Sequence, residues 1–129
     1  MAKGHLAISI LNSFGKDLAR RAKSKCELSG ESGVPLKIYE IPPAKEPEFD
    51  KCLLVSASVL EQLERPKTIT PDQWRHLSEL VWEEEPTIQV MSIRILQYID
   101  KSESWAGEIL SILDAPDEIW EWAEKEPLK

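Results

Sequence analysis

The stretch from Cys26 to Val59 constrains the fold more than any other part of the sequence. It opens with a tight-turn segment, Cys26-Glu-Leu-Ser29-Gly30, and continues into Val34 to Ile41, which has the β-branched and aromatic content of a strand. Pro42-Pro43 ends this strand, because proline has no N–H to donate to a neighbouring strand. A charged loop over 42–51 leads to a second apolar strand, Cys52 to Val55, and to a second turn over 56–59. The sequence therefore predicts two antiparallel strands with a tight turn at each outer end.

The two turns have the spacing of the metal-binding knuckles in a zinc ribbon. A structural zinc site of this kind needs Cys or His at positions 26, 29, 56 and 59. The residues there are Cys26, Ser29, Ser56 and Val59, so one ligand of the four is present. Cys52 lies four residues before Ser56, within the predicted strand, and cannot take over as a ligand without rearranging the ribbon. We interpret residues 26–65 as a degenerate zinc-ribbon-like knuckle without a metal or another cofactor.

Helices are expected to stabilise this ribbon, because a two-stranded ribbon alone is marginal in water. Residues 1–25 contain a predicted helix over 5–24, with a kink or break at Gly15. A short helix over 59–65 is capped by Ser56 or Ser58 and ended by Pro66. Residues 66–129 predict a helical bundle, with helices over 70–84, 86–100, 104–113 and 116–125. The fold class is therefore α+β, mostly α, with the ribbon packed on the bundle.

The helix over 86–100 is apolar on nearly all sides, which predicts that it lies at the centre of the bundle. Arg94 is in the middle of this helix, and a buried guanidinium requires acceptors. We expect a carboxylate partner for it, Glu79 or Glu83.

Composition limits the compartment and the partners. The 129 residues carry a net charge of −7, which makes free nucleic acid and anionic membranes poor default partners. No apolar run reaches the roughly 18 residues of a membrane span, and no signal-peptide pattern opens the sequence. Cys26 and Cys52 either pair through the hairpin or remain two inert thiols, which is the simpler interpretation. We therefore expect a cytoplasmic protein.

Several motifs occur in an order that resembles one known family. They are Gly15 to Leu28, Gly33 to Pro43, Glu61 to Leu63, and the pairs Trp74-Arg75 and Val81-Trp82. As a set they resemble the PhnA-like proteins, named for an alkylphosphonate-utilisation operon, over nearly all of the chain. The resemblance implies an N-terminal zinc ribbon with two Cys-x2-Cys knuckles at positions 26, 29, 56 and 59. It also implies, in longer members, a C-terminal β-barrel domain that has no counterpart in this sequence.

The sequence favours a non-catalytic role. It has no Gly-rich phosphate loop, no Cys–His pair at nucleophile spacing and no His-x-x-His motif. Our leading hypothesis is a metal-free protein-interaction or self-association module, with a protein partner or a second copy of the chain. Trp120 and Trp122 are candidate contact residues, because a two-residue offset turns a helix by about 200° and both rings cannot face inward.

Two alternatives remain open. The basic run Arg20, Arg21, Lys23 and Lys25 adjoins the first turn and suits contact with phosphates, which would make the protein a nucleic-acid-binding derivative of a zinc ribbon. The same cations also suit the negative end of a helix, which is a purely structural explanation. The second alternative, an accessory role in phosphonate metabolism, depends on the family resemblance alone.

Overall fold

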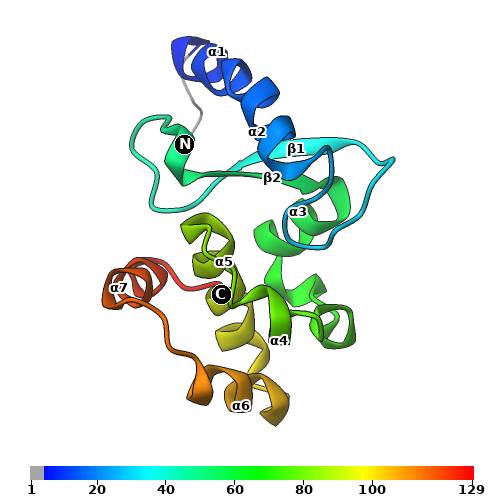
Figure 1. Ribbon diagram of the computed structural model, residues 1–129, viewed down its shortest axis with the longest axis vertical. Coiled ribbons are helices and arrows are strands. Elements are labelled where there is room, and N and C mark those ends of the chain that lie inside the picture. Colours follow the sequence, from blue (N-terminus) through cyan, green and yellow to red (C-terminus); the bar gives the residue numbers. More distant parts are fainter. Residues whose placement is uncertain (1–4) are drawn as a thin grey trace. The chain divides into compact units, whose positions relative to one another are not determined.

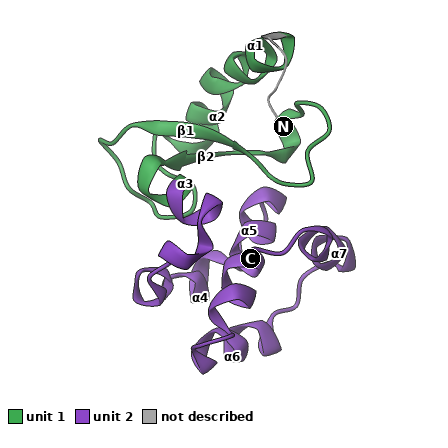
Figure 2. Cartoon of the chain, turned by 180° about the vertical axis from the view of Figure 1, so that it is seen from behind, with its two compact units in different colours: residues 1–60 green, residues 61–129 purple. Residues whose placement is uncertain are grey.

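The computed structural model describes residues 5–129. Over this range the protein is mostly helical with one two-stranded antiparallel sheet, as the sequence predicts (Figure 1). The chain forms two compact units, Met1–Leu60 (unit 1) and Glu61–Lys129 (unit 2), shown in Figure 2. The N-terminal helices thus share one unit with the strands, whereas the sequence suggests separate segments over 1–25 and 26–65. None of the helices described over residues 5–129 is long and apolar enough to cross a membrane.

Unit 1 begins with two helices that meet at the predicted break. Helix α1 spans His5–Ser13 and helix α2 spans Gly15–Ala22. Helix α2 ends at Lys23, which has a left-handed φ of 56° and donates its N–H to the Arg20 carbonyl oxygen at 3.3 Å. Leu18 of α2 is fully buried and packs in one cluster with Cys52 and Leu54 of the sheet. This cluster fixes α2 on one face of the ribbon.

The ribbon consists of β1, Leu36–Glu40, and β2, Cys52–Ser56. The strands pair antiparallel, with Leu36 opposite Ser56 and Glu40 opposite Cys52. Because side chains alternate along a strand, the register places Leu36 and Ile38 of β1 on the same face as Leu54 and Cys52 of β2. A 3₁₀ turn, η1 (Phe49–Lys51), leads into β2. Every residue of β2 is buried, so this strand is central to the fold of unit 1.

The segment after β2 differs from the prediction in one place. Helix α3 spans Ala57–Glu64 and ends before Pro66, as expected, and the 3₁₀ turn η2 spans Pro66–Thr68. The single helix expected over 70–84 is wrong: the structure has a 3₁₀ helix η3, Pro71–Trp74, and a short helix α4, Leu77–Leu80. Trp74, the last residue of η3, and Leu77, the first residue of α4, are both buried. Trp74 also donates from Nε1 to Gln62 Oε1 at 2.9 Å, which holds this turn against the end of α3.

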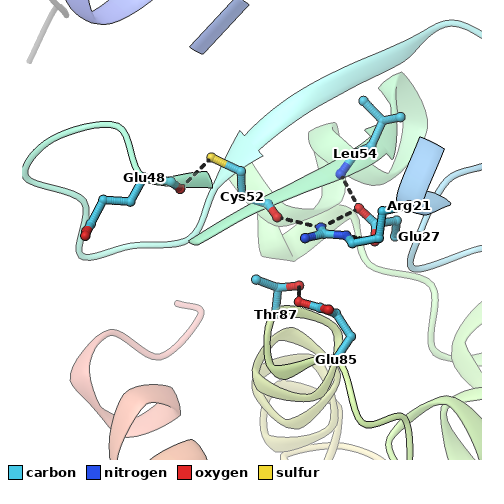
Figure 3. Close-up of polar contacts among 7 residues, drawn as sticks. All are labelled: Arg21, Glu27, Glu48, Cys52, Leu54, Glu85 and Thr87. Atoms are coloured by element: carbon cyan, nitrogen blue, oxygen red, sulfur yellow. Dashed lines mark hydrogen bonds and ion pairs between the residues drawn. The ribbon is translucent and has the colours of Figure 1, made fainter. Parts of the chain in front are cut away.

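Helix α5, Pro86–Ile99, is the centre of unit 2, as its all-round apolar pattern predicts. Its start is held by Thr87, whose hydroxyl donates to Glu85 Oε1 at 3.1 Å (Figure 3). Helices α6, Ser104–Ile112, and α7, Asp117–Lys125, complete the unit, and α4, α6 and α7 all contact α5. The fully buried side chains of α5 form the core of unit 2: Val90, Met91, Ile93, Ile95 and Leu96.

Candidate functional site

The first turn of the knuckle is ordered by the backbone around Cys26. The N–H of Gly30 donates to the Cys26 carbonyl oxygen at 2.8 Å, and the N–H of Cys26 donates to the Glu31 carbonyl oxygen at 2.9 Å. Gly30 has a φ of 80°, a left-handed conformation that glycine adopts without strain. Within this turn the Ser29 N–H points at the sulfur of Cys26, 3.4 Å from Sγ. The turn therefore directs a backbone donor toward the side chain at position 26.

The second turn repeats this pattern with oxygen in place of sulfur. Ser56 Oγ accepts the N–H of Val59 at 3.2 Å, across the same three-residue spacing. Because Ser56 directly precedes α3, this bond is also the N-terminal cap that the sequence predicts for this helix. Positions 26 and 56 thus play equivalent roles, each accepting a hydrogen bond from the residue three positions later.

Glu31 joins the two turns, and the sequence did not indicate it as a candidate site residue. Its Oε1 lies 3.3 Å from Ser29 Oγ and 3.3 Å from Ser56 Oγ, so that both hydroxyls donate to one carboxylate oxygen. The Glu31 N–H also donates to Ser29 Oγ at 3.3 Å. A carboxylate therefore connects two of the four positions where a zinc ribbon would have metal ligands.

The remaining chemistry of the knuckle concerns its thiols. Cys26 and Cys52 are both buried, and neither forms a disulfide. The Cys52 thiol donates to the Glu48 carbonyl oxygen at 3.3 Å (Figure 3). Within residues 5–129, no group of three or more His, Cys, Asp or Glu side chains is arranged to hold a metal ion.

Arg21, one of the candidate phosphate-binding cations, lies in an internal ion pair. Its guanidinium bonds both carboxylate oxygens of Glu27, from Nε at 3.0 Å and from Nη2 at 2.8 Å (Figure 3). Nη2 also donates to the Cys52 carbonyl oxygen at 2.8 Å. The side chain of Glu27 is 3% exposed and that of Arg21 is 21% exposed, so the pair is largely removed from water.

This ion pair closes the open edge of β2. Residues Cys52 and Leu54 turn their backbone polar groups away from β1, because these groups alternate along a strand. Leu54 donates its N–H to Glu27 Oε1 at 2.9 Å (Figure 3) and also accepts the Glu27 N–H at 2.8 Å. Together with the bond from Arg21 to the Cys52 carbonyl, these contacts protect an edge that would otherwise be open to another strand. Arg21 and Glu27 therefore have a structural role at the edge of β2.

The other three cations of the basic run lie at the surface. Arg20, Lys23 and Lys25 are all exposed. Arg20 contacts Asp17, with 3.3 Å between Nη1 and Oδ1, and both of these side chains are more than half exposed. An ion pair so open to water contributes little to stability. These three residues, unlike Arg21, present their charge to solvent.

Trp120 and Trp122 are both half-buried. The buried face of α7 is formed by Ile119 and Ala123, and the two tryptophans lie on either side of it. The carbonyl oxygens of Trp122 and Ala123 accept hydrogen bonds from the buried Arg94, at 2.7 Å from Nη2 and 3.2 Å from Nε.

These bonds give Arg94 two backbone acceptors, and the carboxylate partner expected from the sequence stays a prediction. Both carbonyls belong to the last four residues of α7, which have no N–H partner within the helix, and the residue four positions after Ala123 is Pro127, which has no N–H. The end of α7 therefore uses Arg94 as its hydrogen-bond donor.

Unit 2 also has an apolar groove that the sequence did not predict. This α6 groove has a volume of about 610 Å³ and is lined by Arg75, Ser78, Trp105, Ile109 and Ile112, among others. The Arg75 guanidinium lies over the Trp105 ring, 4.5 Å from its centroid. Ile112, at the end of α6, is 70% exposed. The signal in the sequence was the 3- and 4-residue spacing of Trp105, Ile109 and Ile112, which a core helix would also have.

Comparison with known proteins gives no match. No family model matches the sequence, and neither the curated proteins nor the solved structures include a significant match to it.

Proposed function

We propose that the protein is a non-catalytic self-association module, in which helix α1 of one copy binds the α6 groove of a second copy. The observation that carries the proposal is the exposed apolar surface of α1. Leu6, Ile8 and Ile10 are 73%, 47% and 37% exposed, and α1 contains no Asp, Glu, Lys or Arg. Leu6 and Ile10 lie four residues apart on one face of α1, and Ile8 lies on the opposite face, about 200° from Leu6. Exposed apolar side chains on an uncharged helix are typical of a contact surface.

The α6 groove also supports the proposal, because it offers a surface that α1 of a second copy could contact. Helix α6 lines the groove with the apolar Trp105, Ile109 and Ile112 and with the polar Glu108 and Ser111. Ile112 is the most exposed large apolar residue of unit 2 among those described. A short apolar helix in such a groove is a common mode of recognition between proteins.

The charges of the two units also favour contact between copies. Residues 1–60 contain nine Lys and Arg against seven Asp and Glu, a net charge of +2. Residues 61–129 contain seven Lys and Arg against 16 Asp and Glu, a net charge of −9. Opposite net charges steer unit 1 of one copy toward unit 2 of another, whereas two copies of unit 2 repel each other. The charges therefore favour a head-to-tail arrangement.

The paired turns have a supporting role in this proposal. We interpret them as a zinc-ribbon-like knuckle in a PhnA-like protein, in which the Glu31 carboxylate and the contacts with α2 hold the turns together without a metal. The matching hydrogen bonds at Cys26 and Ser56, and the meeting of Ser29 and Ser56 at Glu31, support this interpretation. In this view the knuckle is a platform that positions α1.

Sedimentation of two charge-inserting variants tests the proposal. We expect the wild-type chain to associate with increasing concentration, and both Leu6→Glu/Ile10→Glu and Ile112→Glu to remain monomeric. Trp82→Glu is the matched control, because Trp82 is 47% exposed and does not line the α6 groove. The altered side chains are all exposed, so circular dichroism should show folded proteins.

Mixing the two variants makes the test specific. The first variant keeps an intact groove and the second keeps an intact α1, so an equimolar mixture should form a heterodimer. A wild-type chain that is monomeric at all concentrations would overturn self-association. Association that survives Ile112→Glu, or a mixture that stays monomeric, would overturn the pairing of α1 with the groove.

A second candidate function is favoured by one observation. Arg20, Lys23 and Lys25, together with Lys16, are exposed on α2 and its end, within the unit that carries net positive charge. This cluster of cations supports contact with a nucleic-acid backbone. The contact would be electrostatic and therefore sensitive to salt.

A further inference from the structure

A second cavity in unit 2 lies apart from the α6 groove. It has a volume of about 370 Å³, within the range of about 300–1,000 Å³ that is usual for small-molecule sites. Pro66, Ile69, Pro71 and Ile99 supply its apolar lining, from the segment around η2 and from the end of α5. Such a lining suits the apolar body of a small organic molecule.

The charged residues that line this cavity are all cationic. They are Lys67, Lys101 and Lys129. The unit around them has 16 acidic residues and seven basic ones, so a cavity lined by three lysines and no acid runs against its overall charge. Three lysines in an otherwise largely apolar lining suit a ligand that combines an apolar body with concentrated negative charge.

A structural explanation for these lysines is that they complement the negative end of α5. The carbonyl oxygens at that end already accept hydrogen bonds from the backbone. Tyr98 O accepts the Lys101 N–H at 3.3 Å, and Ile99 O accepts the N–H groups of Ser102 and Glu103 at 2.9 and 2.8 Å. The lysine side chains are therefore not required as caps for these carbonyls.

The position of Lys101 supports a role at the cavity. Its Nζ lies 5.0 Å from the centroid of the Tyr98 ring, and both residues line the cavity. Contact with an aromatic face holds an ammonium group in place without neutralising its charge. Lys101 is thus held beside the cavity with its charge available.

We propose that this cavity binds a small organic phosphate, with its apolar body against Pro66, Ile69 and Ile99 and its phosphate among the three lysines. A phosphate monoester carries close to two negative charges at neutral pH, which suits several lysines better than a single carboxylate does. This proposal is independent of self-association, because none of these residues lines the α6 groove.

Titration of the full chain with phenyl phosphate, followed by calorimetry and by amide NMR shifts, tests the proposal. Inorganic phosphate and phenol are the comparison ligands, because each has only one of the two features. We expect saturable binding of phenyl phosphate, with shifts at Ile69 and Lys101, and binding of each comparison ligand that is weaker by about tenfold or more.

The matched variants are Lys67→Gln/Lys101→Gln and, as a control, Lys125→Gln, which alters an exposed lysine of the same unit outside the cavity. The double variant should lose about tenfold or more in affinity, and the control should bind as the wild-type chain does. No saturable binding, equal affinity for inorganic phosphate, or an undiminished affinity in the folded double variant would each overturn the proposal.

Discussion

At the scale of single residues, two carboxylates organise the knuckle, but they cannot equal a metal in energy. A structural zinc ion contributes about 10–16 kcal/mol to the folding of a small domain. The hydrogen bonds from Ser29 and Ser56 to Glu31 contribute about 1 kcal/mol each at most, since each is 3.3 Å long and Glu31 is exposed. The stability of unit 1 must therefore come mainly from burial of Leu18, Leu28 and the apolar residues of β2.

Arg21 and Arg20 provide a matched test of what the basic run does. Arg21→Ala removes the partner of Glu27 and leaves a nearly buried carboxylate and the Cys52 carbonyl without this donor. Because Arg21 is partly exposed, we expect a loss of about 2–3 kcal/mol in the free energy of unfolding, below the roughly 3–5 kcal/mol typical of a fully buried pair. Arg20→Ala should change it by less than about 0.5 kcal/mol.

Urea denaturation of the two variants measures this difference. Equal stabilities would show that the pair of Arg21 with Glu27 does not hold the edge of β2. Nucleic-acid binding lost equally in both variants, without loss of stability, would assign Arg21 to a binding surface.

At the scale of elements, local patterns predicted most of the fold. The break at Gly15, both strands, the cap at Ser56 and the buried helix α5 all follow from signals within a few residues. The prediction of one helix over 70–84 is wrong, because a good start signal, Thr70 followed by Pro71, does not determine how far a helix continues. The buried contact of Trp74 with Gln62 determines where the helical segment is interrupted. These two residues are 12 positions apart, so a local signal does not reveal the contact.

The candidate site was harder to predict for the same reason. The spacing within each turn identified positions 26, 29, 56 and 59, but the meeting of Glu31 with Ser56 spans 25 residues. Similarly, the pairing of Arg21 with Glu27 matters because it meets β2, 31 residues away at Cys52. Contacts between residues so far apart in the chain leave no periodic pattern in the sequence.

The end of α7 gives a prediction at this scale. Arg94→Met removes the donors to the Trp122 and Ala123 carbonyls while keeping much of the side-chain volume. Buried acceptors left without these donors should cost about 2–4 kcal/mol in the free energy of unfolding. Urea denaturation followed by tryptophan fluorescence measures the loss, with the exposed Arg65→Met as control. An unchanged midpoint for Arg94→Met would mean that the end of α7 finds other donors.

The paired turns allow a gain-of-function test of the knuckle. Ser29→Cys, Ser56→Cys and Val59→Cys in one chain would complete four thiols with Cys26. If the turns have zinc-ribbon geometry, this variant should bind one Zn²⁺ or Co²⁺ per chain, with the strong thiolate absorption of tetrahedral Co²⁺, and should melt at a higher temperature with metal.

The matched control is the same variant with Cys26→Ser, which leaves three thiols at the four knuckle positions. It should bind more weakly and lose the four-thiolate spectrum. A triple variant that folds but takes up no metal would refute the zinc-ribbon interpretation of the turns.

At the scale of the whole molecule, the division of charge between the units separates the two candidate functions. An apolar contact between α1 and the α6 groove tolerates salt, because burial of apolar surface does not depend on charge screening. A contact between the cations of α2 and a nucleic-acid backbone does not tolerate salt. Four cations on phosphates would give a slope of about −3.6 in log affinity against log salt, or a loss on the order of a hundredfold between 50 and 200 mM.

We expect the protein to self-associate and not to bind nucleic acid. At 150 mM salt, the wild-type chain should still associate in sedimentation and should not bind a fluorescent 20-base-pair duplex, because the net charge of −9 on unit 2 opposes a polyanion. The variant Lys23→Gln/Lys25→Gln removes two exposed cations of the basic run without making unit 1 net negative, and should leave sedimentation at this salt largely unchanged. Duplex binding that falls steeply with salt and disappears in this variant would instead establish the nucleic-acid function. Because both measurements use the same chain, such binding together with a monomeric wild-type protein would replace the self-association proposal.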